Sequence, residues 1–272
     1  MILSRGFSGQ TLTPGTSLCK LNGMTSQGKQ DTVLGVIPAR LGSTRLPHKV
    51  LREVAGRPLV EWVYRAASSC AAFRRVVVAT DSDEVLSVCR ERGIEAMLTS
   101  PLCASGSDRV FEVAGKIPAD IYVNIQGDEP LLTAAHFAAL LAPFKLPDVG
   151  VTTLSVPCPV GNLTNPNVVK VVTALDGRAL YFSRAAIPHL RNGANQSPLW
   201  RKHLGIYAYR RSALAAFAML SPSPLEEAEK LEQLRLLENN IPIWIAEAPA
   251  DTVGVDTEED LIAVEKILLA RG

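Results

Sequence analysis

Three cationic side chains lie close together in a loop that contains no carboxylate. Arg40, Arg45 and Lys49 fall within ten residues that follow a short apolar run. Arginine can bind a phosphate through two parallel hydrogen bonds, and lysine supplies a compact point charge. Apart from Asp31, the chain has no acidic side chain before Glu53. The loop therefore suits a concentrated negative charge such as a nucleoside triphosphate, and the alternative is a solvated basic loop.

This loop matches neither of the common phosphate-binding signatures. A Walker A loop needs Gly-x-x-x-x-Gly-Lys followed by Ser or Thr, but Gly35 and Gly42 are too far apart and no lysine follows Gly42. A Rossmann fingerprint needs Gly-x-Gly, which occurs nowhere in the chain. The loop amides, together with the hydroxyls of Ser43 and Thr44, remain as hydrogen-bonding groups for phosphate or base.

Carboxylates follow a second apolar run. Residues 121–125 read as a strand that delivers Gln126, Asp128 and Glu129 at its carboxyl end, where α/β sheets place their ligands. A carboxylate there, facing a phosphate loop, suits magnesium, which prefers oxygen ligands. The alternative is a helix N-terminus, since acidic residues also favour a first turn. Asp256 could be a second metal ligand or an N-cap, and its local sequence favours the N-cap.

Short β-branched runs alternate with helical patterns from residue 32 onward, which predicts an α/β fold with a mostly parallel central sheet. Strands are expected at residues 33–37, 76–79, 94–98, 121–125, 151–156, 168–173, 180–183 and 204–209. Helices are expected from Leu59, from about Asp81 to Gly93, over residues 107–115, from Ser223 to about Glu238, and after Thr257. Asp176 and Gly177 signal a hairpin. Residues 32–272 therefore read as one domain with a smaller hairpin-bearing lobe.

Residues 1–31 are expected to form an N-terminal extension outside that domain. The first thirty residues are rich in Gly, Ser and Thr and contain no acidic side chain. That composition is compatible with an organellar transit peptide. A disordered tail, or a true start at Met24, are the alternatives.

The overall composition narrows the class of protein. With 47% hydrophobic and 20% charged residues and a formal charge of +1, the chain reads as an ordinary globular protein without the basic excess of a nucleic-acid or membrane-surface binder. No apolar run approaches the roughly 18 residues of a membrane span. Its five cysteines are scattered without a Cys-x-x-Cys pair, which argues against zinc and favours a reducing compartment such as the cytoplasm.

Ordered blocks along residues 33–270 resemble the sugar-nucleotide cytidylyltransferases, and in particular the CMP-Kdo synthetase (3-deoxy-manno-octulosonate cytidylyltransferase) family. Each block is weak alone, but the ordered set is specific. The blocks are residues 38–49, 78–81, 105–109, 124–130, 165–171, 180–185, 203–207, 221–226, 231–235 and 254–257.

The resemblance implies a Rossmann-like nucleotide-diphospho-sugar transferase fold. It implies CTP and 3-deoxy-D-manno-octulosonate (Kdo) as substrates, CMP-Kdo and pyrophosphate as products, and Mg²⁺ as cofactor. It further implies a homodimer and a place in the biosynthesis of lipopolysaccharide or another Kdo-containing polysaccharide. Two rival readings are a CMP-sialate or other sugar-acid cytidylyltransferase, and a non-catalytic nucleotide-binding homologue.

The resemblance also assigns roles to residues. The nucleotide and its phosphates would contact Pro38, Ala39, Arg40, Ser43, Arg45, Lys49, Ser105, Gly106 and Gln126. Asp128 and Asp256 would be metal ligands, which reverses the local reading of Asp256, and with Arg40 and Lys49 they would form the catalytic set. The sugar side would hold Arg184, His203, Tyr207 and Gln233, although Tyr207 also suits a core and Gln233 a solvated helix.

Two positions depart from the family pattern near the expected nucleotide site. His48 stands where the family usually has glycine, and Ala104 stands where a glutamine commonly precedes Ser-Gly. The first departure concerns the conformation of the basic loop, and the second removes one polar contact to substrate.

Overall fold

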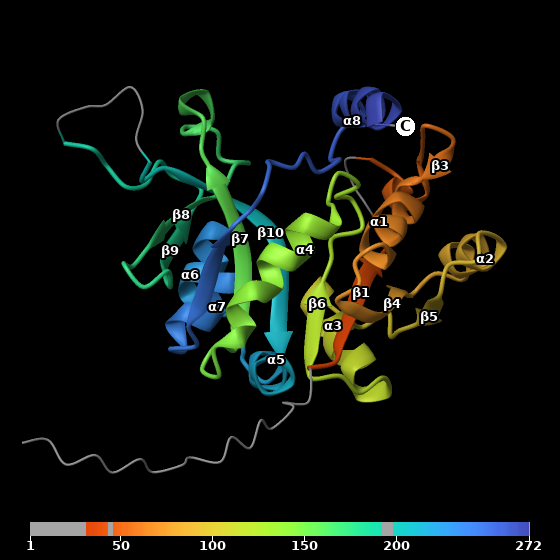
Figure 1. The fold of residues 1–272 in the computed structure, drawn as a ribbon, viewed down its shortest axis with the longest axis horizontal. Coiled ribbons are helices and arrows are strands. Elements are labelled where there is room, and N and C mark those ends of the chain that lie inside the picture. The colour runs from red at the N-terminus through yellow and green to blue at the C-terminus, as the bar shows by residue number, and fades with distance from the viewer. Residues whose placement is uncertain (1–30, 43–45, 192–197, 272) are drawn as a thin grey trace, which may run out of the picture. The chain divides into compact units, whose positions relative to one another are not determined.

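The computed structural model describes residues 31–42, 46–191 and 198–271 (Figure 1). By its contacts the chain forms two units, Met1–Gln30 and Asp31–Gly272. The expected N-terminal extension lies outside the described residues except for Asp31.

A mixed sheet lies at the centre of the second unit. Within the described residues it has nine strands, in the order β11-β7-β10-β6-β1-β4-β5, with β8 and β9 attached through β8 to β10. Its strands are β1 Val33–Ala39, β4 Phe73–Thr80, β5 Ala96–Leu98, β6 Ile121–Asn124, β7 Val151–Pro157, β8 Lys170–Thr173, β9 Ala179–Ser183, β10 Arg201–Arg210 and β11 Ile243–Glu247. A separate pair consists of β2 Glu53–Val54 and β3 Arg57–Pro58.

Most strands of the sheet run in the same direction, as expected for a mostly parallel sheet. Strand β1 pairs in parallel with β4 and β6, β4 with β5, and β11 with β7. Strand β10 runs antiparallel to β6, β7 and β8. Strands β8 and β9 form the hairpin lobe, and Gly177 at its turn has a φ of 88°, a conformation that glycine adopts without steric cost.

The helices cover both faces of the sheet (Figure 1). They are α1 Leu59–Ser68, α2 Asp83–Glu91, α3 Gly106–Lys116, α4 Ala134–Leu141, α5 Arg211–Ala218, α6 Pro224–Glu229, α7 Gln233–Glu238 and α8 Glu258–Arg271, with 3-10 turns η1 Lys49–Leu51, η2 Ala142–Lys145 and η3 Val160–Asn162.

Strand β1 shows how the sequence builds these layers. Its side chains alternate between two apolar cores because successive residues of a strand point to opposite faces. Val33 and Ile37 pack in the core beneath α1, α2 and α4, whereas Leu34 and Val36 pack in the core beneath α3, α5 and α7. The strand is apolar on both faces because both faces are covered.

Some sequence-based expectations are wrong in detail. The helix expected from Ser223 to about Glu238 is two helices, because Lys230 adopts a left-handed conformation with a φ of 53° and ends α6. The sequence pattern also did not predict α4, α5 or β11. Helix α4 is almost uniformly apolar, so it lacks the polar and apolar alternation that marks an amphipathic helix.

Among the described helices, none combines the length and the apolar character that crossing a bilayer requires.

Candidate active site

The two polar segments identified in the sequence leave neighbouring strands at the same edge of the sheet. Strand β1 leads into the basic loop and β6 leads into residues 125–132, and the two strands pair in parallel. The segments approach so closely that a Cβ on Gly127 would lie 3.0 Å from the carbonyl oxygen of Pro38. A side chain at position 127 would therefore crowd the approach of the two loops.

Lys49 joins the two carboxylates expected to bind metal. Its Nζ lies 2.5 Å from Asp128 Oδ2 and 3.0 Å from Asp256 Oδ1. Burial lowers the pKa of Lys49, but the charges and hydrogen bonds of both aspartates outweigh burial and raise it above the ordinary value. Three of the four residues expected to be catalytic thus meet from distant parts of the chain.

Thr257 takes the cap position directly before the final helix, and the Asp256 carboxylate faces Lys49. The capping interactions belong to Thr257 and Asp260: Asp260 N donates to Thr257 Oγ1, and Asp260 Oδ2 accepts from the backbone amides of Asp256 and Thr257. The local N-cap interpretation is therefore wrong, and the Asp256 carboxylate points toward Lys49 instead.

A cavity of about 270 Å³ opens beside this cluster. Its walls are Pro38, Arg40, Gly42, Lys49, Val50, Gly106, Gln126, Gly127, Asp128 and Asp256. Five residues expected to contact nucleotide are among them. Ala39 is fully buried and is not part of the cavity lining. Ser43 and Arg45 lie outside the described residues.

The N-terminus of α3 forms one side of the cavity. Ser105 and Asp108 make a reciprocal capping box, in which the Ser105 hydroxyl accepts from Asp108 N and the Asp108 carboxylate accepts from Ser105 N. Arg40 Nη1 donates to the carbonyl oxygen of Ala104 at 3.2 Å, which links the basic loop to this helix end. A helix N-terminus exposes amide donors and a positive dipole end, both of which suit an anion.

The backbone conformation of His48 explains why the family usually has glycine at this position. It has a φ of 54° and a ψ of 29°, in the left-handed region. Glycine adopts that conformation freely, whereas another residue pays roughly 1–2 kcal/mol. The turn into η1 keeps this geometry with histidine in place of glycine.

A second cavity, of about 480 Å³, lies on the other side of Asp256. It is lined by Glu129, Asn165, Asn167, Val168, Val169, Lys202, His203, Leu204, Gly205, Thr252, Val253, Gly254, Asp256, Thr257 and Asp260. Asp256 therefore lines both cavities.

Three of the four residues expected on the sugar side are buried, and among them His203 lines this cavity. His203 Nε2 shares a hydrogen bond with Thr153 Oγ1 at 2.9 Å. Burial lowers the pKa of His203 to about 3. Tyr207 packs against His203, and its hydroxyl is buried without a hydrogen-bond partner in the part of the chain that the structure describes. Gln233 is also buried, at the start of α7, so it is not a solvated helix residue.

Arg184, the fourth, has a different arrangement. Its guanidinium donates to the backbone carbonyls of Pro166, Glu229 and Lys230. Arg184 thus links the loop that carries Asn165 and Asn167 to the end of α6, and its own hydrogen bonds go to the protein backbone.

Sequence reasoning missed the position of Glu129 in the second cavity. Its Oε2 atom is buried and, among the described residues, has no hydrogen-bond partner. Burial, with the neighbouring charge of Asp128, raises the pKa of Glu129 to about 7. Gly254 gives this carboxylate room, since a Cβ there would lie 3.3 Å from Glu129 Oε1. The only sequence signal was that Glu129 directly follows Asp128.

Comparisons with known proteins show the family to which the chain belongs. The profile of the family described as cytidylyltransferase matches residues 34–245. A 3-deoxy-manno-octulosonate cytidylyltransferase of Acidobacterium capsulatum is 65% identical over 239 residues, covering 88% of this chain and 97% of that protein. A protein of the same name from Koribacter versatilis is 50% identical over 238 residues, covering 88% and 90%.

A solved structure shares both fold and sequence. It is that of a CMP:2-keto-3-deoxy-manno-octonic acid synthetase in complex with CTP, with a TM-score of 0.85 and 40% identity. The similarity covers 89% of this chain and 100% of that one.

Proposed function

We propose that this chain, which belongs to the 3-deoxy-manno-octulosonate cytidylyltransferase family, makes CMP-Kdo and pyrophosphate from CTP and Kdo. The observation that carries the proposal is the convergence of Lys49, Asp128 and Asp256 in the smaller cavity, where Asp256 also lines the larger one. A nucleotide in the smaller cavity and a sugar acid in the larger one would meet at Asp256.

The reaction is a nucleotidyl transfer. The anomeric oxygen of Kdo attacks the α-phosphorus of CTP, the bond from that phosphorus to the pyrophosphate oxygen breaks, and the hydroxyl proton is released. Positioning and charge stabilisation supply most of the catalysis in such transfers. Arg40 and Lys49 would offset the charge of the triphosphate and of the leaving pyrophosphate, and the amides at the start of α3 would receive further anionic oxygen.

The residues around Lys49 fit a magnesium ion. One oxygen of Asp128 and one of Asp256 lie within 3.0 Å of the Lys49 ammonium group. The two carboxylates therefore face the same cationic position. In the described residues no group of three or more His, Cys, Asp or Glu side chains is arranged for a metal. Magnesium commonly uses one or two carboxylates plus substrate phosphates, so Asp128 and Asp256 would hold it. When bound, Mg²⁺ supplies positive charge at the α-phosphate and favours ionisation of the attacking hydroxyl.

The sugar acid would occupy the larger cavity. His203 is neutral at physiological pH and keeps its hydrogen bond to Thr153. The unpartnered hydroxyl of Tyr207 and the buried amide of Gln233 would serve polar groups of the sugar. Arg184 would act through the loop of Asn165 and Asn167, because its own donors already bind carbonyl oxygens.

The remaining parts of the proposal rest on the family resemblance and the composition. They are a homodimer, a location in the cytoplasm, no nucleic-acid or membrane partner, and a role in the biosynthesis of Kdo-containing polysaccharide. Light scattering after size-exclusion chromatography tests the dimer directly, and a single species at the mass of one 29.2 kDa chain would contradict it.

Pyrophosphate release tests the reaction itself. The purified protein with Mg²⁺, CTP and Kdo should release pyrophosphate, and replacing Kdo by sialate or CTP by another triphosphate should reduce the rate sharply. A faster rate with sialate would support the sialate alternative. The complete absence of turnover with every sugar acid, despite CTP binding, would support the non-catalytic alternative.

A further inference from the structure

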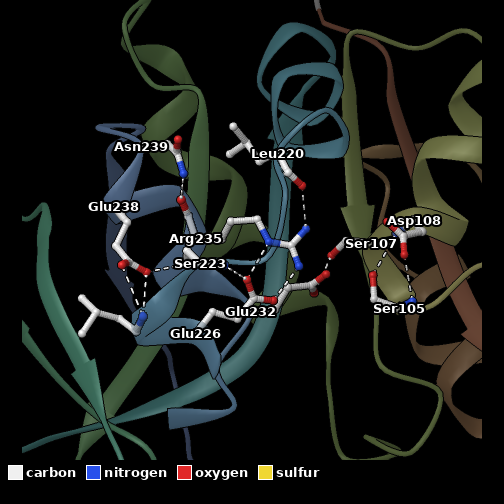
Figure 2. Close-up of polar contacts among 11 residues, drawn as sticks. Ser105, Ser107, Asp108, Leu220, Ser223, Glu226, Glu232, Arg235, Glu238 and Asn239 are labelled. Atoms are coloured by element: carbon white, nitrogen blue, oxygen red, sulfur yellow. Dashed lines mark hydrogen bonds and ion pairs between the residues drawn. The ribbon is translucent and has the colours of Figure 1, made fainter. Parts of the chain in front are cut away.

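Glu232 links the start of α7, where the sugar-side residue Gln233 lies, to helix α3 beside the nucleotide cavity. It is the residue before α7 and precedes Gln233, which is expected near the sugar. Its Oε2 accepts a hydrogen bond from the Ser107 hydroxyl of α3 at 3.0 Å (Figure 2). Burial raises the pKa of Glu232, against hydrogen bonds from Ser105 and Ser107 that lower it. The nearby charge of Arg235 also lowers the pKa of Glu232, and the side-chain hydrogen bonds to its carboxylate come from hydroxyl groups.

The helices that carry Glu232 are held firmly by other contacts. Arg235 forms an ion pair with Glu226, with donor–acceptor distances of 2.7 and 2.5 Å, and also donates to the carbonyl oxygen of Leu220. The carboxylate of Glu238 accepts from the Ser223 hydroxyl and from the backbone amide of Leu225 (Figure 2). These contacts stabilise α6 and α7 independently of Glu232. The hydrogen bond between Ser107 and Glu232 is therefore a further contact, and it joins α7 to α3.

Ser107 lies directly behind the wall of the nucleotide cavity. Its hydroxyl is buried and also lies 3.5 Å from Nδ2 of Asn124, the last residue of β6. Asn124 in turn packs beneath Gly106, where an added Cβ would lie 3.5 Å from that Nδ2 and 3.5 Å from Pro38 Cγ. Gly106 and Pro38 both line the cavity. A displacement of Ser107 would therefore move the cavity wall.

We propose that Glu232 is a positioning residue for the nucleotide: its carboxylate holds Ser107, and through Ser107 the first turn of α3 and Asn124, in the place that CTP binding requires. The inference rests on the proposed function for the identity of the nucleotide. Glu232 is partly buried, and a carboxylate in such a place costs free energy that an apolar residue would not. Glu232 is also not needed to cap α3, because Ser105 and Asp108 already complete the capping box of that helix.

Binding of CTP alone tests the inference without any sugar. Isothermal titration with CTP and Mg²⁺ should give a Kd about tenfold higher for Glu232→Ala than for the wild type, which corresponds to ~1.4 kcal/mol. Glu232→Gln keeps an acceptor for the Ser107 hydroxyl, so its Kd should stay within about threefold of the wild-type value. Ser107→Ala should weaken binding as Glu232→Ala does, and the double variant should be no weaker than either single one, because both changes remove the same link.

Glu238→Ala is the matched control. It removes a carboxylate–hydroxyl contact on the same helix, but that contact reaches Ser223 and does not touch α3. Glu238→Ala should lower the melting temperature and leave the Kd for CTP unchanged. The inference is overturned if Glu232→Ala binds CTP as the wild type does, if Glu238→Ala weakens binding equally, or if Glu232→Ala and Ser107→Ala are additive. Failure of the wild type to bind CTP would overturn the proposed function itself, and this inference with it.

Discussion

At the scale of single residues, the site depends on side chains whose charge is balanced by only a few neighbours. Lys49 is mostly buried between Asp128 and Asp256, at 14% side-chain exposure. A change to any one of the three leaves the others with unbalanced charge in a partly dehydrated place. Arg40 differs, because it is exposed and its described hydrogen bond goes to a carbonyl oxygen.

Asp128→Asn should abolish most turnover while leaving the fold intact. The amide oxygen still accepts from Lys49, but the negative charge that would hold Mg²⁺ is lost, so the turnover rate should fall roughly a hundred- to thousandfold. Steady-state pyrophosphate release measures this rate, and circular dichroism checks the fold. Asp148→Asn, at an exposed turn, should keep the wild-type rate. Near-normal activity of Asp128→Asn would contradict the metal assignment.

His203 should make stability depend on pH below neutrality. Burial lowers its pKa from 6.5 to about 3 in the folded protein, so between these values the unfolded state binds a proton that the folded state does not. Stability is therefore fully present above pH 6.5 and is lost as pH falls, by about 2 kcal/mol at pH 5. Urea unfolding at pH 7 and pH 5 should show this loss, and His203→Gln should reduce it. His189→Gln, at an exposed position, should keep the wild-type loss; equal pH dependence in both variants would contradict the assignment.

At the scale of elements, α8 fixes the segment that presents Asp256. Leu261, Val264 and Leu268 of this helix pack in an apolar cluster with Leu46 and Leu59. The turn between β2 and β3 also contributes, since the backbone amide of Ala55 donates to Glu265. Leu46 of the basic loop packs in this cluster, so one apolar contact region supports both the loop and the segment that carries Asp256.

Leu268→Ala should lower the free energy of unfolding by about 2–4 kcal/mol, because it removes a buried side chain and leaves a cavity. Leu269 is the next residue on the same helix but is 65% exposed, and Leu269→Ala should change stability by no more than about 0.5 kcal/mol. Chemical denaturation measures both. Similar effects of the two substitutions would show that α8 does not pack as described.

At the scale of the whole molecule, the site joins segments that are remote in sequence. Lys49 and Asp128 are 79 positions apart, and Lys49 and Asp256 are 207 apart. A ligand that bridges them stabilises the folded state of the entire unit, because the unfolded chain cannot present the three groups together.

CTP and Mg²⁺ together should therefore raise stability more than CTP alone. At a CTP concentration of 100 times its Kd in the presence of Mg²⁺, the free energy of unfolding should rise by about 2.7 kcal/mol. Removal of the metal with EDTA should reverse most of this gain, and Asp256→Asn should show little gain at all. Thermal melts follow each condition. A gain that persists unchanged in EDTA would argue against metal-assisted nucleotide binding.

Much of the fold was predictable because its signals are local. Strand β1 has apolar residues on both faces, and the capping box of Ser223 and Glu226 lies within four residues. The break at Lys230 was not predictable, because a lysine carries no preference for a left-handed conformation. Helix α4 was missed because its uniform apolar surface is set by burial between neighbours, which a periodic pattern does not encode.

The sequence by itself determined the basic loop, the carboxylates at the end of β6 and the order of family motifs, because each depends only on residue types and short spacings. Only the tertiary structure decided where side chains point. It turned Asp256 toward Lys49 rather than onto the helix end, directed Arg184 to backbone carbonyls, and buried Glu129 beside Gly254. These outcomes depend on which distant elements pack together, and burial and charge at each position follow from that packing.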